Sequence, residues 1–568
     1  MTNRSISPAR PALLPWAVLI AILAVLVGAS VGIMADAPYN DDFAYLTSVR
    51  WLHEAGVLKF TNWQYMTLVT QTALGGLWTF FFGYSVHALR ILTLVIWAVG
   101  TVALVQALRS DNWVKTLILL SAAALSPMAL VLATSFMTDI YYWALIIVAM
   151  TLFASGLETD RRAVLIASWV VLFLAVFVRQ VALPVAVAFV IADLLKNGFS
   201  RSVLVRSVLP LALIALAYAL SVKLAAATIG LPRDFTDSTA AISHMLRDLM
   251  MLKLGALRPF FNACILTSVY VGLFFIPLFL AGLVGMIRLP YPRLTAAGTI
   301  ALGALLFVCL ALLVKQPLPS AGNLINLYGL GPRSDWRELG SSVPPVWWAV
   351  TVLASLSGAF LVTAILCEIA SILLTGGWRA LRGQWRPLMF LVAAVLGNAP
   401  LMVGYAAWFD RHLLALLAML GIGCLSLLRF APVSAPRTAV PVVPALLGIL
   451  LSILLLHDFG AWQRATLQGY AALQAHGIAA SQVDGGFEIS NHVLHAAARA
   501  DQPAPDVLHL EVRSRPCQVT DLETTRAGGA IAGIVPIERW LPIGPAAVSY
   551  RCGEFTGPDV PRAAAVAH

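Results

Sequence analysis

The chain has 568 residues, of which 60% are hydrophobic and only 11% are charged, and its mean hydropathy is +0.86. Apolar runs of this length and number exclude an ordinary soluble globular protein. They also exclude a transmembrane β-barrel, whose strands would alternate apolar and polar residues, because these runs are continuous over about 20 residues. The sequence therefore predicts an all-α polytopic membrane protein.

The apolar runs, taken in chain order, predict about 13 spans. Their expected bounds are 12–34, 87–108, 115–133, 140–157, 163–178, 181–195, 203–222, 264–287, 294–313, 346–374, 387–407, 412–428 and 439–457. With this odd count the short basic loops all fall on one side, which the positive-inside rule assigns to the cytoplasm. These loops account for most of the net charge of +10, so the charge does not indicate a nucleic-acid partner. The N-terminus is expected inside and the C-terminus outside.

Three segments leave alternatives open in this topology. Ala35-Asp36-Ala37 resembles a signal-peptidase site, but the apolar run before it is long for a cleaved signal and Pro38 follows, so we expect an uncleaved first span. The short runs that flank Arg179 are expected to be two spans, with a broken helical hairpin as the alternative. Gln64–Phe82 contains Thr, Gln and Gly among its apolar residues, and we expect an interfacial helix there rather than a fourteenth span.

This orientation divides the chain into a membrane domain, residues 1–457, and an outer C-terminal domain, residues 458–568. The membrane domain has three sizeable outer loops, 35–86, 223–262 and 314–345. Loops on a rigid scaffold commonly carry specificity, so we expect substrate contacts there, with Asn323, Tyr328 and Arg333 as candidates in the third loop.

The tail after residue 457 has the composition of a globular domain. Short Val/Leu/Ile runs alternate with Gly, Pro and Asp turns, at Val507–Val512, Val535–Ile537 and Ala547–Tyr550, and predict a small α+β domain. Cys517 and Cys552 form an even pair in what would be an oxidising compartment, which favours a disulfide over the alternative of two free thiols.

Asn40-Asp41-Asp42 is the most unusual local feature, because it puts two adjacent carboxylates just beyond the first span of a chain that otherwise avoids charge. A carboxylate at the membrane surface can accept a proton from a hydroxyl group, and a neighbouring acid raises its pKa toward the useful range. The alternative is structural. An Asp before the helix expected at Phe43–Ala55, which Gly56 would end, could simply cap it.

Asp139 and two arginines are expected at the same outer side. Asp139 follows the third span, although Thr138 or Asp139 could also cap the next one. Arg179 and Arg411 oppose the positive-inside bias, so a phosphate or pyrophosphate partner is one explanation, with Gln180 and His412 beside them. The alternatives are snorkelling to headgroups or pairing with a local acid such as Asp410.

The sequence contains no Walker loop, dinucleotide fingerprint, Cys-x-x-Cys motif or metalloprotease helix, and the cytoplasmic loops are too short for a nucleotide-binding domain. An enzyme of this kind would need an activated substrate that reaches it from the outer face. A secondary transporter or lipid flippase is the main alternative, but it would usually carry its charges in mid-span and show two related halves. A scaffold is a third possibility that leaves the carboxylates without a role.

Several short motifs occur in a characteristic order. After the acidic pair come Phe82-Gly83-Tyr84-Ser85 with Leu89-Arg90, then Thr138-Asp139, then Phe409-Asp410-Arg411-His412-Leu413-Leu414. This order resembles that of the GT-C glycosyltransferases, and in particular the bacterial family-39 branch related to protein O-mannosyltransferases and lipid A aminoarabinose transferases. Pro319–Pro332 and Asp484-Gly485-Gly486-Phe487-Glu488 are also similar to bacterial members whose substrates are unassigned.

The resemblance implies a GT-C-like fold and an inverting hexosyl- or pentosyltransferase that uses a polyprenyl-phosphate sugar. Asp41 would be the base or its partner, Asp42 its neighbour, and Asp139 the acid of the second outer loop. Arg411 would lie near the donor phosphate, and the charge argument adds Arg179. His412 stands where many relatives have Tyr.

The resemblance also implies the surroundings of the enzyme. The acceptor would be a glycan, lipid or protein in the periplasm, and the protein would lie in the bacterial inner membrane. No cofactor is required, although some relatives show a divalent ion near the acidic residues, which Asp41, Asp42 and Asp139 could hold through oxygen ligands.

Overall fold

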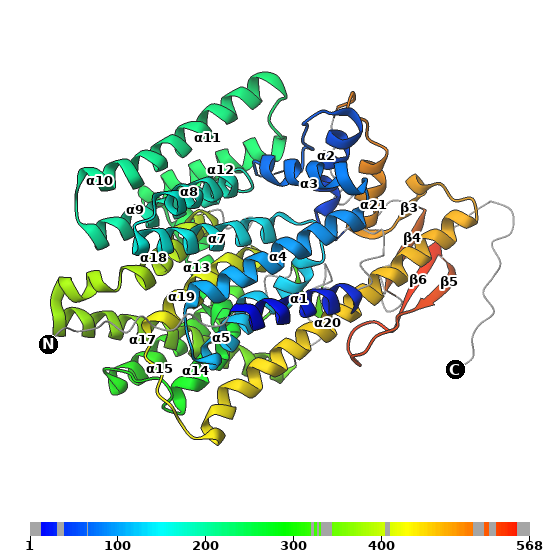
Figure 1. The fold of residues 1–568 in the computed structure, drawn as a ribbon. Helices are drawn as coiled ribbons and strands as arrows, with labels where there is room; N and C mark the ends of the chain where they lie inside the picture. The colour runs from blue at the N-terminus through cyan, green and yellow to red at the C-terminus, as the bar shows by residue number, and fades with distance from the viewer. Residues whose placement is uncertain are drawn as a thin grey trace.

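The computed structural model describes residues 13–30, 39–64, 66–319, 323–326, 329–330, 344–403, 409–503, 516–521 and 530–553. Figure 1 shows a bundle of long helices with a small sheet at one end. The first half of the bundle contains α1 (Leu13–Ser30), α2 (Asp42–Ala55), α3 (Val69–Phe82), α4 (Val86–Leu108), α5 (Trp113–Leu119), η1 (Leu120–Ala124), α6 (Pro127–Ala133), α7 (Thr138–Thr159), α8 (Arg162–Val176), η2 (Gln180–Ala182), α9 (Leu183–Asn197), α10 (Arg201–Val203), η3 (Leu204–Val208) and α11 (Leu209–Thr228).

The second half of the bundle ends in a very long helix, α20 (Ala435–Ala475), which extends beyond the bundle into the tail. Its elements are α12 (Arg233–Met250), α13 (Leu254–Phe274), α14 (Ile276–Leu283), α15 (Pro292–Cys309), η4 (Leu310–Val314), α17 (Pro345–Gly383), α18 (Trp385–Val403), η6 (Asp410–His412), α19 (Leu413–Leu427) and α20 (Ala435–Ala475). A two-stranded ribbon, β1 (Ile325–Asn326) with β2 (Gly329–Leu330), lies in the third predicted loop.

The helices confirm a polytopic membrane protein. Ten helices in the described ranges are long and apolar enough to cross a membrane, and an eleventh span results if the pair Trp113–Ala124 and Pro127–Ala133, bent by 59°, counts as one. Two shorter apolar helices, at 17–28 and 162–176, occupy the other two predicted runs. Each of the 13 predicted runs therefore contains an apolar helix, but the count of 13 spans is not confirmed.

The segment around Gln64–Phe82 forms α3, which has 14 residues. About 20 residues are needed to cross the hydrocarbon core, so α3 is too short for a span. Phe80, Phe81 and Phe82 at its end are exposed. These features fit the predicted interfacial helix better than the alternative of a fourteenth span.

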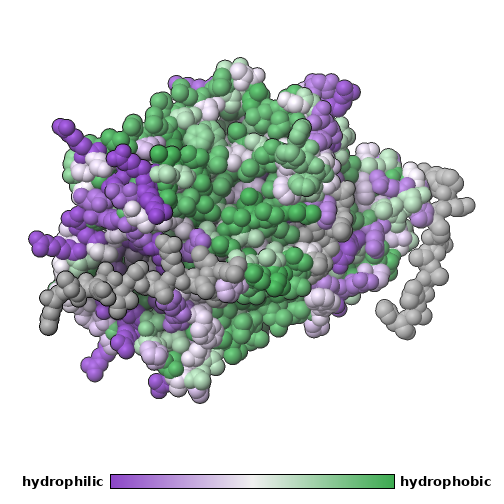
Figure 2. All heavy atoms as spheres, viewed as in Figure 1, coloured by the Kyte–Doolittle hydropathy of each residue, from purple (hydrophilic) through white to green (hydrophobic). Residues whose placement is uncertain are grey.

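The basic loops gather at one end of the bundle, as the predicted topology requires. Arg109 and Arg386 both form ion pairs with Glu158, although they lie in different loops. Arg382, in the same predicted loop as Arg386, donates to the carbonyl of Leu195 at the end of α9. Figure 2 shows the same arrangement as a hydrophilic end followed by a broad apolar surface over the helices.

Helices α13 and α17 touch at glycine. A Cβ atom on Gly272 would lie 2.0 Å from the carbonyl oxygen of Ala354, and one on Gly358 would lie 2.3 Å from that of Ser268. Small residues at such a crossing allow the two backbones to approach closely within a membrane, where van der Waals packing drives helix association.

Gly272→Ala is expected to destabilise the protein by about 1–3 kcal/mol, because the methyl group meets backbone rather than a movable side chain. The midpoint of thermal unfolding in detergent measures the effect. Gly448→Ala on α20 is the matched control, because a Cβ atom there would have no neighbour within 4 Å. Equal midpoints for the two variants would contradict the tight crossing.

The tail forms the predicted α+β unit. Its elements are η7 (Ala480–Gln482), β3 (Val483–Asp484), α21 (Gly486–Ala496), β4 (Cys517–Asp521), β5 (Ala530–Pro536) and β6 (Ala547–Cys552), and the sheet order is β3-β4-β6-β5. Val507–Val512 lies outside the described residues. The predicted boundary at 457/458 falls inside α20, a continuous helix of 41 residues that belongs to both parts.

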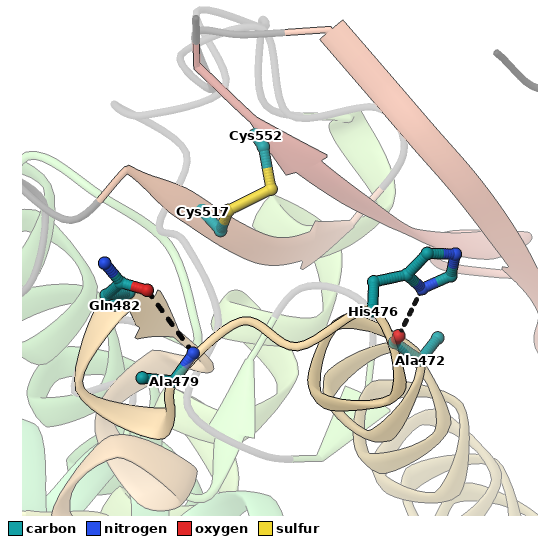
Figure 3. The surroundings of a disulfide bond; sticks show 6 residues. All are labelled: Ala472, His476, Ala479, Gln482, Cys517 and Cys552. Carbon is teal, nitrogen blue, oxygen red and sulfur yellow. Dashed lines mark hydrogen bonds between the residues drawn. A yellow bond between two sulfur atoms is a disulfide. The ribbon is translucent and has the colours of Figure 1, made fainter. Parts of the chain in front are cut away.

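Cys517 and Cys552 form the predicted disulfide, so the alternative of two free thiols is wrong (Figure 3). The two cysteines are register partners at the ends of the antiparallel strands β4 and β6. Both side chains are buried in a small core that includes Tyr470 and Leu473 of α20. The bridge therefore fastens together the strands that α20 packs against.

Candidate functional site

The acidic pair lies where the chain enters α2. Asn40 adopts a left-handed conformation, with φ 51°, and Asp41 and Asp42 follow it as the N-cap and the first residue of the helix. The Asp41 side chain makes no capping hydrogen bond with the helix. Gly56 ends α2 in a left-handed conformation, as predicted. Helix capping therefore does not account for the pair, and both residues turn inward, where they are at most 5% exposed.

Asp42 holds the backbone of two segments. Its carboxylate accepts hydrogen bonds from the N–H of Tyr39 at 2.7 Å and of Phe136 at 3.3 Å, just before α7. The Arg90 guanidinium lies 4.0 Å away and stacks on the Tyr39 ring. Burial raises the pKa of Asp42 to about 7, although Arg90 and the two N–H donors oppose the shift. Asp42 therefore fixes the acidic loop against the turn that leads into α7.

Asp41 instead forms an ion pair with Arg411. Its Oδ2 lies 2.7 Å from Arg411 Nη1, and both side chains are almost completely buried. Arg411 lies in η6, directly before α19. The contact therefore joins the first outer loop to the start of a helix far along the chain. The predicted alternative partner, Asp410, is engaged elsewhere.

Asp139 and Arg179 form a second buried ion pair. Arg179 Nη1 lies 2.9 Å from Asp139 Oδ1, and Arg179 Nε donates to the Thr138 hydroxyl at 2.9 Å. No side chain caps α7, so the alternative role of Thr138 or Asp139 as a cap is wrong. The arginine reaches this position because the chain turns between α8 and η2.

The two ion pairs belong to one cluster, which we call the paired-charge cluster: Asp41, Arg411, Asp139 and Arg179. Tyr45 on α2 is buried and interacts electrostatically with all four members, and the pKa of its hydroxyl is raised chiefly by burial. His412, next to Arg411, interacts with both arginines. The structure thus brings together the predicted acids and cations, which come from α2, α7, η2 and η6.

The cluster keeps hydrogen-bonding capacity in reserve. Asp139 Oδ2 and Arg411 Nε are buried and have no hydrogen-bond partner among the described residues, whereas Asp139 Oδ1 and Arg411 Nη1 are held in the ion pairs. Buried polar groups are normally satisfied, and each exception costs about 1–3 kcal/mol. An anionic or hydroxylated ligand would supply the missing partners.

The third predicted loop reaches the site through Asn323. Its side-chain oxygen accepts from the Asn40 amide at 2.9 Å. Asp410 holds the same segment, because its carboxylate accepts from the N–H groups of Leu324 and Ile325. Tyr328 and Arg333, the other candidates in this loop, lie outside the described residues.

The tail also contributes to the site, through a residue to which the sequence assigned no role. The Glu488 carboxylate on α21 accepts a hydrogen bond from the backbone N–H of Asn40 and another from the Gln463 amide of α20. Glu488 is buried, and burial raises its pKa to about 7. The only available signal was the Asp484–Glu488 motif, which carries no information on its partner.

Further contacts hold the tail against α2. The Arg50 guanidinium donates to the carbonyls of His495, Ala496 and Ala498 at the end of α21, where a cation interacts favourably with the helix terminus. The Phe43 ring packs against Phe487 with ring centroids 5.6 Å apart. The acidic loop is therefore covered by the tail.

The carboxylates are engaged by cationic and N–H donors. No group of three or more His, Cys, Asp or Glu side chains in the described ranges is arranged to hold a metal ion. Asp41 and Asp139 face arginines, and the oxygens of Asp42 face N–H groups. Cationic and N–H donors occupy the positions where a divalent ion would need free oxygens, so these residues do not fit the ion that the family resemblance suggested.

The buried acids predict a pH-dependent stability. Asp42 and Glu488 keep their protons up to about pH 7 in the folded protein but lose them near pH 4 when unfolded. The folded state thus binds more protons in this window, and stability should fall as the pH rises from about 4 to 7, by up to about 1.4 kcal/mol per pH unit for each group, and then level off. Glu488→Gln should make the fall shallower.

Thermal unfolding in detergent between about pH 5 and 8 measures this difference. Glu54→Gln, at an exposed position on α2, is the control and should leave the slope of the wild type unchanged. Parallel curves for Glu488→Gln and wild type would show that Glu488 does not retain its proton in the folded state.

Searches of family models and of curated proteins found no match. Among solved structures, the chain is similar to ArnT from Cupriavidus metallidurans bound to undecaprenyl phosphate, with 14% identity and a TM-score of 0.37 over 96% of this chain and 99% of that one. It is also similar to the oligosaccharyltransferase AglB from Archaeoglobus fulgidus, in complex with an inhibitory peptide and a dolichol-phosphate. That match has 13% identity and a TM-score of 0.34 over 80% of this chain and 58% of that one.

Proposed function

We propose that the protein is an integral-membrane glycosyltransferase that moves a sugar from a polyprenyl-phosphate donor to an envelope acceptor. The observation that carries the proposal is the paired-charge cluster, in which two carboxylates and two guanidinium groups are buried together beside the outer loops. Such a cluster is costly to bury and is retained where its charges have a task. The order of the sequence motifs supports the same reading.

In the proposed reaction, Asp41 is the general base. The acceptor hydroxyl oxygen attacks the anomeric carbon, the bond from that carbon to the phosphate oxygen breaks, and the electron pair leaves with the polyprenyl phosphate. The proton of the hydroxyl group passes to Asp41, and attack from the face opposite the phosphate inverts the configuration. Asp42 is a positioning residue that holds the acidic loop in place, because both of its oxygens accept hydrogen bonds from backbone N–H groups.

Arg411 and Arg179 are proposed to receive the phosphate. A guanidinium group binds phosphate oxygens through two parallel hydrogen bonds, and Arg411 Nε, which has no hydrogen-bond partner among the described residues, is available for this. His412 would lie beside the same phosphate. The leaving group then gains charge next to two cations, while the carboxylates that pair with them become free to bind the acceptor.

The proposal places the enzyme in a bacterial inner membrane. The basic end of the bundle would face the cytoplasm and the tail the periplasm, in agreement with the positive-inside rule. The isoprenoid chain would lie along the apolar surface of the helices. A sugar carried on a lipid is already activated, so no nucleotide is needed at the site.

The test compares cells that lack the protein with cells that produce it. Mass spectrometry follows the envelope glycolipids and glycans together with their polyprenyl-phosphate precursors. The proposal predicts that one sugar is lost from an envelope product and that its lipid-linked donor accumulates. If the donor instead stays unchanged while a lipid or solute is redistributed across the membrane, transport is the function and the proposal is wrong.

A further inference from the structure

The loop between β5 and β6, residues 537–546, presents an exposed apolar surface. Trp540 is 57% exposed and Ile543 is 45% exposed. In Figure 1 the loop lies beside α20, below the sheet of the tail. An exposed tryptophan in a short apolar loop is unusual for a surface that faces only water.

The loop is held against α20 by two adjacent residues of that helix, His457 and Asp458. The Asp458 carboxylate accepts hydrogen bonds from the N–H groups of Trp540 at 2.6 Å and Leu541 at 2.9 Å. The His457 ring stacks on the Trp540 indole, with ring centroids 3.6 Å apart and an angle of 7° between the planes. These contacts leave the other face of the indole exposed.

This level is where the lipid-facing surface of α20 ends. The large exposed hydrophobic residues of α20 are Val440, Val443, Leu446, Leu447, Leu450 and Leu451, and none follows in the rest of the helix. His457 and Asp458 come about two turns later and are largely covered. Trp540 and Ile543 therefore continue the exposed apolar surface just beyond the point where the exposed apolar residues of α20 end.

We propose that loop 537–546 is a membrane-interface anchor whose partner is the headgroup and upper acyl region of the bilayer that α20 crosses. Tryptophan favours this region, because its apolar ring and its N–H group match the two sides of the boundary. Ile543 adds a second exposed apolar side chain to the loop.

The test uses the full chain in phosphatidylcholine nanodiscs that contain a phosphatidylcholine with a photoreactive group near the headgroup. Trypsin cuts after Arg539 and Arg551, so the loop is recovered as one peptide, 540–551, and mass spectrometry locates the attached lipid. The wild type should carry lipid on this peptide as well as on α20. In Trp540→Ser/Ile543→Ser the label on 540–551 should fall to background while that on α20 persists.

Ile531→Ser/Ile534→Ser is the matched control, because it removes two exposed apolar residues from β5 in the same sheet. It should keep the label on 540–551. The mass of the linked Cys517 and Cys552 peptides reports whether each variant folds its tail. If the wild-type loop carries no more lipid than the peptide that contains α21, the surface faces water or a soluble partner, and the proposal is overturned.

Discussion

Asp41→Asn is expected to lower the rate of sugar transfer by about 10²- to 10⁴-fold, the usual contribution of a general base. The substitution keeps the size and one oxygen of the side chain but removes its ability to accept a proton. Arg411 also loses its charged partner, so some loss of stability should accompany the effect. The measurement is the initial rate of transfer in membranes, normalised to the amount of folded protein.

Asp42→Asn separates this role from a structural one. Asp42 has no oxygen that is free of backbone contacts, so its substitution should reduce the thermal midpoint more than the rate per folded molecule. Glu54→Gln on the exposed side of the same helix should change neither. A rate for Asp41→Asn within threefold of wild type, about 0.7 kcal/mol in the barrier, would exclude Asp41 as the base.

Arg411→Ala is expected to destabilise the protein by about 3–5 kcal/mol, because it leaves the Asp41 carboxylate buried without a counter-charge. Asp41→Asn/Arg411→Ala should be more stable than Arg411→Ala alone, since it leaves no unpaired charge. Denaturant or thermal unfolding in detergent measures both differences, and together with the single variants gives the coupling between the two sites.

Arg499→Ala is the control for this cycle, because the Arg499 side chain forms an exposed ion pair with Asp501. Exposed pairs contribute about 0–1 kcal/mol, so a small effect is expected there. If Arg411→Ala lowers the free energy of unfolding no more than Arg499→Ala does, Arg411 does not stabilise the charge of Asp41 in the folded protein.

The sequence predicts the helices of the membrane domain well, because hydropathy is a local property that the lipid environment imposes on each segment separately. The same holds for the helix after Asp42, which Gly56 ends, and for the short α3. The cysteine pair could also be predicted, since only two cysteines lie in the polar tail. Exact bounds depend on packing, and α20 passes through the predicted domain boundary without interruption.

The partners of the charged residues could not be predicted. Arg411 has an acid as its immediate neighbour, yet it pairs with Asp41, while Asp410 holds the backbone of Leu324 and Ile325. These choices depend on how distant helices meet, and a single sequence contains no such information. The role of Glu488 was missed for the same reason, because Asn40 lies 448 positions away.

The contact between Glu488 and Asn40 has a consequence for biosynthesis. The acidic loop leaves the ribosome early, whereas its tail partner emerges only near the end of translation. The hydrogen bond from Asn40 to Glu488 can therefore form only after the tail has been synthesised and folded. A truncated or stalled chain would insert its first spans in the membrane but would lack this contact, so its acidic loop would remain incomplete.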